Sequence, residues 1–337
     1  MSGNSASFRR RKLVLVFVVD PLDGLNPAHD SSVAMMEAAQ ERGHRILAAT
    51  MSGLEIRGGR TVARCTPLTV RPAVLREGRW HAPPRWYTAA PCVQVTLEDA
   101  DAVLVRTDPP VDAKYLAGTL LLDYVGSSRC LVINSPAGLR NANEKLFALR
   151  WPDLCPDTVV TADVPAVIRV TEDWGKAVLK PTDGMAGRGI MMLRPEDPNL
   201  TSIIEAATDR GRRHVVVQRF LDKADEGDRR VIVLNGEPIG AIRRIASGRD
   251  FRCNMAAGAT VTADVVTSRD KDICNRLAPA LAEQGLAFVG IDIIGDHLTE
   301  INVTSPTGLR EIDAFSGTRL CHDVFSFIER QCAHLCK

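Results

Sequence analysis

Two carboxylates and one amide stand on otherwise apolar strands near the carboxyl end of the chain: Asp292, Glu300 and Asn302. Burying a carboxylate in a sheet is costly unless a metal ion or another cation pairs with it. Oxygen-only ligands suit Mg²⁺, which keeps several waters and shares substrate phosphates. These residues are therefore candidate metal ligands. The alternative is an edge hairpin whose polar side chains face water.

The geometry of this candidate metal site depends on one turn. Two apolar, β-branched runs flank Gly295-Asp296 and predict a hairpin. Glu300 and Asn302 are two residues apart, so they share one face. A loop centred on Asp296 would place Asp292 opposite Glu300, whereas a two-residue turn at Gly295-Asp296 would put these two carboxylates on opposite faces. Both arrangements remain open at this point.

A lysine ends a second apolar strand, at residues 177–181, immediately before a glycine-rich loop. Lys180 is followed by residues 183–189, which contain three glycines. A cation beside such a loop indicates that the ammonium group and backbone N–H groups converge on phosphate oxygens. The loop is not a Walker A motif, because no G-K-[ST] follows, and no helix opens from it as in a dinucleotide fingerprint. A plain glycine-rich turn is the alternative.

Arginines occur on both sides of a predicted hairpin turn. Asn235-Gly236 is a strong type I′ signal, so the residues before and after it lie on neighbouring strands. Arg230 and Arg244 could then form a positive clamp for carboxylate or phosphoryl oxygens. The returning strand ends at Arg243-Arg244, and the choice between these two remains open. Two exposed arginines on a sheet edge are the alternative.

The N-terminal third predicts an open α/β sheet. Residues 13–19 form a continuous apolar run, typical of a strand buried on both faces. A helix capped by Asp30 and a strand at 45–50 complete a β-α-β unit. The buried strand at 102–106 ends in Arg106. Open α/β sheets bind ligands just past the carboxyl ends of such strands, so Arg106 is a candidate ligand-binding residue.

Further elements are expected along the chain. They are a hairpin at 54–71, helices at 112–124, from 135, at 270–284 and at 317–336, and strands at 130–134, 190–193, 214–217 and 231–234. Residues 77–96, rich in Pro, Trp and Tyr, are predicted to be irregular and have no assigned element. Residues 1–12 are expected to be a disordered tail.

Composition narrows the class of protein. With 337 residues, 45% hydrophobic and 25% charged, and a net charge of +1, the chain is expected to form two or three globular lobes. Near-neutral charge argues against nucleic acid or a membrane as the main partner, and no apolar run approaches the length of a membrane span. The nine cysteines form no C-x-x-C pair, which disfavours zinc. An odd cysteine count without a signal peptide suits a reducing cytoplasm.

The order of these signals resembles the ATP-grasp superfamily. Several short sequence motifs are similar to those of prokaryotic-type glutathione synthetases. The matching stretches are D-S-S-x-A-M at 30–35, R-x-D-P-P at 106–110, N-E-K-L-F at 143–147, L-K-P-x-D-G-M at 179–185, G-D-x-R-V at 227–231, N-x-A-A-G at 254–258, the long block at 288–307 and R-E-I at 310–312. The match spans nearly the whole chain from residue 13.

The resemblance implies an α/β fold, namely an ATP-grasp fold preceded by a Rossmann-like α/β domain. On this basis we expect four parts: a disordered tail at 1–12, an N-terminal substrate-side domain at 13–136, a small ATP-grasp lobe with the lid at 137–212, and a large C-terminal lobe at 213–337.

The resemblance also implies roles by position. Residues expected to bind ATP are Lys145, Lys180, Asp183, Gly184, Met185, Gly187, Gly189, Gln218, Phe220 and Leu221. Among them the two lysines would hold phosphates, residues 184–189 would form a mobile lid, and residues 218–221 would receive adenine through backbone groups. Residues expected to face the peptide substrate are Ser31, Arg106, Asp228, Arg230, Arg244 and Asn254, with Arg230 and Arg244 also catalytic. Asp292, Glu300 and Asn302 would bind Mg²⁺ or Mn²⁺.

The implied reaction uses ATP as co-substrate to join γ-glutamylcysteine and glycine through an acyl phosphate, and the family resemblance favours a homo-oligomer, a dimer or a tetramer. The chain departs from the family at Ala186, Cys253, Ala259 and residues 76–96. These departures cluster at the lid and the substrate side. A related ligase for another carboxylate and amine is therefore the chief alternative. A non-catalytic nucleotide-binding paralogue is disfavoured, because the nucleotide and metal groups are retained.

Overall fold

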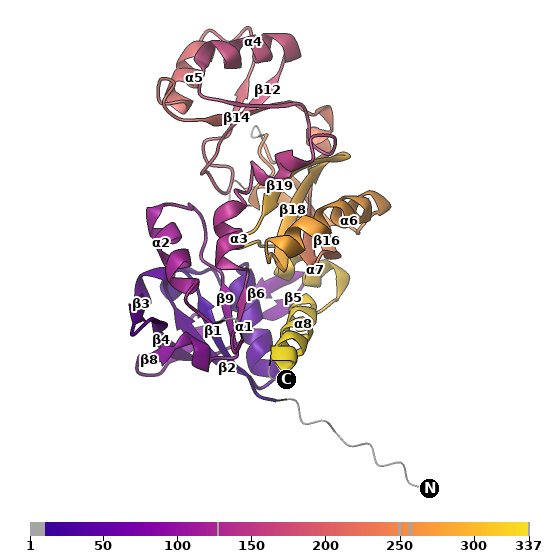
Figure 1. Cartoon of the computed structure of the whole chain (residues 1–337). Coiled ribbons are helices and arrows are strands. Elements are labelled where there is room, and N and C mark those ends of the chain that lie inside the picture. Colours follow the sequence, from indigo (N-terminus) through magenta and orange to yellow (C-terminus); the bar gives the residue numbers. More distant parts are fainter. Residues whose placement is uncertain (1–10, 127, 249–250, 256–257, 336–337) are drawn as a thin grey trace.

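The computed structural model describes residues 11–126, 128–248, 251–255 and 258–335, so most of the predicted tail, residues 1–10, lies outside it. Within these residues the chain builds three main sheets and a separate two-stranded ribbon. Figure 1 shows the sheet of the N-terminal domain below, the C-terminal sheet in the middle, and a smaller lobe set apart above them.

The N-terminal sheet confirms the predicted β-α-β opening. Its strand order is β10-β9-β1-β2-β4-β3, with β7 and β8 also paired to β4. Four strands run parallel, β1 (Val14–Val18), β2 (Arg45–Ala49), β9 (Ala102–Val105) and β10 (Leu131–Ile133). The antiparallel part contains β3 (Leu54–Arg57), β4 (Arg60–Val70), β7 (Tyr87–Ala89) and β8 (Val93–Thr96). The parallel strands therefore direct their carboxyl ends to one edge.

Helices cover both faces of this sheet. They are α1 (Ser31–Glu41), α2 (Ala113–Leu122), α3 (Pro136–Asn141) and the C-terminal α8 (Leu320–Leu335). Successive residues of β1 alternate between two cores: Leu15 and Phe17 pack in the core that includes α1 and α8, while Val16 and Val18 pack in the core that includes α2 and α3. Burial on both faces explains the continuous apolar run in the sequence.

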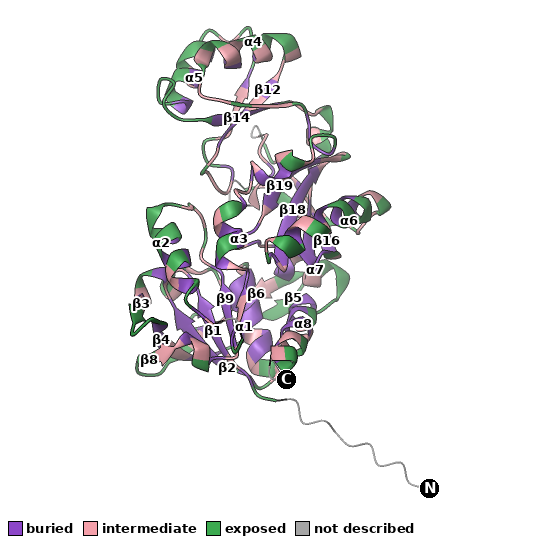
Figure 2. Cartoon of the chain, viewed as in Figure 1, coloured by how far each residue is buried: buried purple, intermediate pink, exposed green. Residues whose placement is uncertain are grey.

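The smaller lobe has a core of its own. Its sheet order is β11-β14-β12-β13, built from β11 (Thr158–Thr161), β12 (Ala177–Pro181), β13 (Met191–Leu193) and β14 (Val215–Arg219), with helices α4 (Val164–Trp174) and α5 (Leu200–Ala207). Strand β14 pairs with β11 and β12, although the boundary predicted at residue 212 assigned it to the next lobe. The sheet therefore continues to Arg219. Figure 2 shows that the outer faces of α4 and α5 are largely exposed.

The C-terminal sheet is antiparallel, with the order β17-β16-β15-β18-β19. Its strands are β15 (Asp228–Leu234), β16 (Glu237–Ile245), β17 (Thr260–Ala263), β18 (Phe288–Ile294) and β19 (His297–Asn302), and helices α6 (Ser268–Glu283) and α7 (Leu309–Ser316) pack on it. Asn235 and Gly236 both have positive φ, as the predicted type I′ turn requires. Single-turn 3₁₀ helices occur at Leu22–Gly24, Met51–Gly53, Leu97–Asp99, Phe147–Arg150 and Asp222–Glu226.

The hairpin formed by β18 and β19 combines the two arrangements left open by the sequence. Ile294 pairs with His297 across a two-residue turn, yet further along Asp292 pairs with Glu300. The register shifts in between, and Thr299 is the extra residue of the resulting bulge. The bulge therefore brings the two carboxylates opposite each other despite the short turn.

Two regions differ from the expected organisation. Within residues 77–96, predicted to be irregular, the chain forms short strands, and β5 (Val74–Arg76) with β6 (Arg79–His81) makes the separate ribbon. Helix α8, assigned from the sequence to the C-terminal lobe, packs mainly against α1 and β10 of the N-terminal domain and also contacts α7. None of the helices in the described parts of the chain is long and apolar enough to cross a membrane.

A buried ion pair network holds α8 in place. Glu329 accepts hydrogen bonds from Arg42 Nε (2.8 Å) and Nη2 (2.7 Å). His44 Nε2 lies 2.9 Å from the same carboxylate. Burial lowers the pKa of His44, whose side chain is fully buried, and this effect outweighs the charge of Glu329. The last helix is thereby tied to α1 and to the residue before β2.

We expect Glu329→Gln to lower the free energy of unfolding by about 1.5–3 kcal/mol, the range for hydrogen bonds to charged groups. Urea denaturation would measure it. The exposed neighbour variant Arg330→Gln should stay within about 0.5 kcal/mol of the parent. Equal losses in the two variants would show that this network does not hold α8.

Candidate functional site

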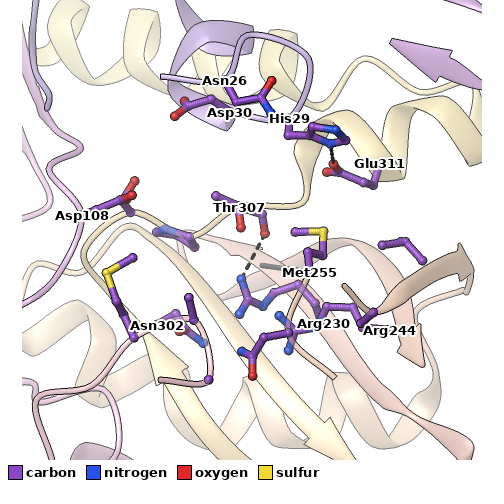
Figure 3. Close-up of a pocket in the computed structure, with 18 of the residues that line it drawn as sticks. Asn26, His29, Asp30, Asp108, Arg230, Arg244, Met255, Asn302, Thr307 and Glu311 are labelled. Atoms are coloured by element: carbon purple, nitrogen blue, oxygen red, sulfur yellow. Dashed lines mark hydrogen bonds and ion pairs between the residues drawn. The ribbon is translucent and has the colours of Figure 1, made fainter. Parts of the chain in front are cut away.

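A large cavity opens where the three lobes meet. Its volume is about 1060 Å³. It lies at the carboxyl ends of the parallel strands, as expected for an open α/β sheet. Side chains from all three sheets or their loops reach it, as Figure 3 shows in part. They include Asp30, Asp108, Lys145, Arg230, Arg244, Asn254, Glu300, Asn302 and Glu311.

A second, smaller cavity of about 90 Å³ lies between the small lobe and the C-terminal sheet. Its apolar lining comes from both lobes and includes Val178, Ile190, Phe220, Leu221 and Ile294. Lys180, Gln218 and Asp292 also line it, and Glu300 and Asn254 line both cavities. An apolar slot that shares polar walls with a larger polar chamber suits a flat base beside its phosphates.

One buried carboxylate balances two arginines at the floor of the site. Asp292 accepts from Arg230 Nε (2.5 Å) and Nη2 (2.9 Å), and Arg244 Nη2 lies 3.0 Å from the same group. Burial alone raises the pKa of Asp292, but the charges of Arg230 and Arg244 outweigh it and hold the pKa well below its usual range. Asp292 is therefore ionised and fully engaged with protein cations.

The structure also decides between the two adjacent arginines on β16. Arg244 lines the large cavity, and its guanidinium receives support from Asp228 at 2.6 and 2.7 Å. Arg243 instead pairs with Asp264 at 2.9 Å, away from the cavity. Asp228, predicted to face the substrate, accepts hydrogen bonds from Arg244 with both carboxylate oxygens. It therefore orients that arginine.

The residues predicted to hold a metal come together, but they are not equivalent. Glu300 and Asn302 line the large cavity, and Glu300 has only a loose contact of 3.8 Å with Lys180. Asn302 donates its amide to Asp292 (3.2 Å), which leaves its oxygen for other partners. Within the described residues, no group of three or more His, Cys, Asp or Glu side chains is arranged to hold a metal. A hard cation fits only if water or substrate oxygens complete its shell.

Both predicted phosphate-binding lysines are buried. Lys145 donates to the Gly184 carbonyl at 2.5 Å, which ties the loop after β12 to the start of the small lobe. Burial lowers the pKa of Lys180, an effect partly opposed by Glu300. A buried ammonium with a weak partner is an incomplete ion pair, which the oxygens of an anionic ligand would complete.

Residues 184–188 of the loop predicted to be a lid line the large cavity. Arg252 donates to the Gly187 carbonyl at 2.9 Å, and a Cβ at Gly187 would lie 2.6 Å from Asn254 Oδ1. Ala186, which replaces a family glycine, adopts a left-handed φ of 53°, a conformation costly for alanine. Met185 and Gly187 line the large cavity, whereas Asp183 and Gly189 line neither of the two. Ala256 and Ala257 of the predicted N-x-A-A-G stretch fall outside the described residues.

Ser31 and Arg106, predicted to face the substrate, lie behind the cavity wall. Arg106 donates to Ser32 Oγ (3.1 Å) and to the Pro306 carbonyl (2.9 Å). Ser31 Oγ accepts from the Leu309 backbone N–H at 3.3 Å. Both are buried and hold the segment between β19 and α7, so they support the wall of the cavity without lining it.

Glu144 was not singled out from the sequence, although it stands beside Lys145. Its Oε1 accepts from Val303 N (3.0 Å), Thr304 N (3.2 Å) and Thr304 Oγ1 (2.8 Å). Burial raises the pKa of Glu144 despite these bonds. Nothing local in the sequence signals this role, because its partners lie about 160 positions away.

The class of protein follows from this arrangement. A lysine-bearing small lobe faces a carboxylate-bearing hairpin across a cavity beside a Rossmann-like domain, and this defines an ATP-grasp carboxylate–amine ligase. The fold agrees with the crystal structure of D-cycloserine synthetase DcsG, which superposes with a TM-score of 0.63 over 94% of this chain and 99% of that one at 15% identity.

The chain belongs to the prokaryotic glutathione synthetase family. The model of the family's N-terminal domain matches residues 13–140, and the model of its ATP-grasp domain matches residues 144–317. A relative from Nostoc sp. strain PCC 7120, named Glutathione synthetase, is 48% identical over 94% of this chain and 98% of its own length. A relative of the same name from Thermosynechococcus vestitus is 48% identical over 93% of this chain and 99% of its own.

We expect the two facing carboxylates to differ in their effect on stability. Asp292→Asn should lower the free energy of unfolding by about 3–5 kcal/mol, because it leaves buried Arg230 without an anion and Arg244 with Asp228 alone. Glu300→Gln should cost about 1 kcal/mol, since it removes only a loose pair with Lys180. Urea denaturation of both variants checks this. Similar losses would mean that Asp292 is not the anchor of the arginines.

Proposed function

We propose that this ligase joins γ-glutamylcysteine to glycine with ATP, through an acyl phosphate. One observation carries the proposal. The two neighbouring cavities are lined by the buried lysines Lys145 and Lys180, by oxygen donors and by the arginine pair, in a chain 48% identical to relatives named Glutathione synthetase. Phosphorylating a carboxylate needs charge neutralisation and exclusion of water, and this set of groups supplies both.

The nucleotide would bind with its base in the smaller cavity. Phe220 and Leu221 line that slot beside Gln218, whose side chain is held by Thr158 at 3.1 Å. The phosphates would then extend towards Lys180 and Lys145 and lie beneath the glycine-rich loop. Loop backbone groups and two ammonium groups suit phosphate oxygens.

Mg²⁺ would bind beside those phosphates, held by Glu300 and Asn302, with Asp292 behind them. Mn²⁺ shares the preference for hard oxygen ligands. The ion would neutralise phosphate charge when bound. Asp292 holds its two arginines in this structure, so its contribution as a ligand requires it to give up one of these contacts.

The arginine pair would bind the reacting carboxylate. Arg230 and Arg244 both line the large cavity, and their side chains are fixed by Asp292 and Asp228. Fixed donors at this point would hold the donor carboxylate for phosphoryl transfer and stabilise the oxyanion when the amine attacks. The loop around Gly187 and Asn254 would exclude water from the acyl phosphate.

We also infer a reducing compartment and a homo-oligomer. Seven cysteines of the described residues carry free thiols, which suits the reducing cytoplasm; they are Cys65, Cys92, Cys130, Cys155, Cys253, Cys274 and Cys321. Leu116, Leu120 and Tyr124 are exposed at a spacing of four residues along and just after α2. An apolar stripe of this kind is typical of a helix that packs against another subunit.

Lys180→Ala should weaken ATP binding by about 10- to 100-fold and leave adenosine binding within about 3-fold of the parent, because the lost partner is a phosphate. Isothermal calorimetry with both ligands measures the difference. The exposed variant Lys223→Ala serves as the control. Equal weakening of ATP and adenosine would make Lys180 a structural residue.

The reaction itself can be followed with labelled donor. ADP should form at a sustained rate only with Mg-ATP, γ-glutamylcysteine and glycine together, and ¹⁸O from the donor's cysteinyl carboxylate should appear in the released phosphate. Omission of glycine should allow at most one slow turnover, because the closed loop protects the intermediate. If the label stays in the product, the acyl phosphate route is wrong. If label transfer occurs but another donor and amine react far better, only the substrate pair is wrong.

A further inference from the structure

One wall of the large cavity carries a carboxylate that the proposed chemistry does not use. Glu311 lies in the first turn of α7, with its side chain 10% exposed, and lines the cavity. Its Oε1 lies 3.1 Å from His29 Nδ1, while Oε2 is enclosed and has no hydrogen-bond partner among the described residues. Figure 3 shows this pair across the cavity from Arg230 and Arg244.

An enclosed carboxylate oxygen without a donor indicates a missing partner. His29 is a replaceable partner, because its side chain is 67% exposed and lies on the loop before α1. A ligand cation that entered the cavity could therefore take its place. Asp30, beside His29, also lines the cavity, so the neighbourhood favours a positive group.

The ribbon of β5 and β6 adds a cation to the same wall. Arg79 is exposed and lines the cavity, and its side chain makes no hydrogen bond or ion pair with any described residue. Its neighbour Trp80 donates Nε1–H to the Arg310 carbonyl at 2.6 Å, and the Arg310 guanidinium lies 4.9 Å from the Trp80 ring. Glu37 of α1 then accepts from Arg310 (2.7 Å) and from Ala73 N (3.0 Å). The ribbon is thereby fixed against α7.

Trp80 contacts Arg310, and the residues next to them in the chain, Arg79 and Glu311, both line the large cavity. We propose that this wall recognises the amino acid end of the donor: Glu311 accepts hydrogen bonds from its α-ammonium group, and Arg79 donates to its α-carboxylate. The inference rests on the proposed function, since it concerns the end of γ-glutamylcysteine that does not react.

The arginine pair and Glu311 line the same cavity and are linked through one short segment of its wall. Arg230 Nη1 donates to the Thr307 carbonyl at 3.1 Å, and Glu311 follows Thr307 by four residues. Residues 307–311 thus form one short stretch of the cavity wall that connects a contact of Arg230 with Glu311. A donor held at both ends would span from the arginine pair to Glu311.

The arrangement also solves a problem of selection. The donor carries two carboxylates, and only the cysteinyl one must be phosphorylated. If Glu311 and Arg79 engage the α-ammonium and α-carboxylate together, the other carboxylate is left for Arg230 and Arg244. Recognition of opposite charges in one geometry rejects donors that lack either.

Two donor analogues separate these contacts. Glutarylcysteine lacks only the α-amino group of γ-glutamylcysteine, and 4-aminobutyrylcysteine lacks only the α-carboxylate. ADP formation with glycine and Mg-ATP gives kcat/KM for each donor. The parent protein should use each analogue about 10- to 100-fold less well than γ-glutamylcysteine, the effect of losing one charge-assisted hydrogen bond.

The variants assign each contact to a residue. Glu311→Gln should lower kcat/KM for γ-glutamylcysteine about 10- to 100-fold, leave glutarylcysteine within about 3-fold of the parent, and keep the discrimination against 4-aminobutyrylcysteine. Arg79→Gln should lower kcat/KM for γ-glutamylcysteine about 10- to 100-fold, leave 4-aminobutyrylcysteine within about 3-fold of the parent, and keep the discrimination against glutarylcysteine. Arg76→Gln, on the other strand of the ribbon, changes an exposed arginine that does not line the cavity and should change none of the three values.

The possible failures are distinguishable. If the parent uses γ-glutamylcysteine but Glu311→Gln and Arg79→Gln discriminate as the parent does, the inference is overturned and the proposed function stands. If the parent forms no ADP with γ-glutamylcysteine and glycine, both are overturned. Calorimetric ATP affinity reports folding of each variant. Should Glu311→Gln fail to fold, the exposed Arg79→Gln decides: unchanged discrimination against 4-aminobutyrylcysteine rejects the proposal.

Discussion

The buried carboxylate of Asp292 is the interaction on which the rest of the site depends. It neutralises Arg230 on β15 and Arg244 on β16, and it accepts a hydrogen bond from Asn302 on β19. Four strands, including β18 with Asp292 itself, therefore contribute to the contacts of one charged group. A buried arginine without an anion would be strongly destabilising, so these strands must keep their register. The same requirement presents the arginines to the cavity in a fixed orientation. Ion pairs within the protein therefore hold these donors in place, and donors held in this way can stabilise a developing charge.

A second constraint joins the domains beneath the cavity. The segment between β19 and α7 is held by Glu144 at Val303 and Thr304, and by Arg106 at Pro306. Asn134, just after β10, adds bonds to the Phe288 and Val303 carbonyls at 2.8 Å. The N-terminal and C-terminal sheets also share two continuous cores, whereas the small lobe has a separate one. The floor and substrate side of the cavity are therefore one rigid unit. The small lobe, which carries Lys180 and the glycine-rich loop, has the independence that closure over a nucleotide requires.

Local sequence patterns predicted many of the strands and turns of this fold. The continuous apolar run at residues 13–19 predicted a strand buried on both faces. Asn235-Gly236 predicted the type I′ turn between β15 and β16. Strand β14 and helix α8 were harder to assign, because an apolar strand or an amphipathic helix does not specify which sheet it joins. Ser31 and Arg106, predicted to face the substrate, instead bond to Ser32 and to backbone groups of the distant residues Pro306 and Leu309. Neither side chain lines the large cavity.

The sequence by itself determined the family, the strands that carry the charged residues, and the spacing of Glu300 and Asn302 on one face, because these follow from side-chain chemistry and strand period. Tertiary structure alone decided how Asp292 meets Glu300, since the bulge at Thr299 offsets a turn that would otherwise separate them. It also decided that Arg244 and not Arg243 enters the cavity. In both cases the choice depends on register against a neighbouring strand. Register is set by long-range pairing and burial, which a single stretch of sequence does not contain.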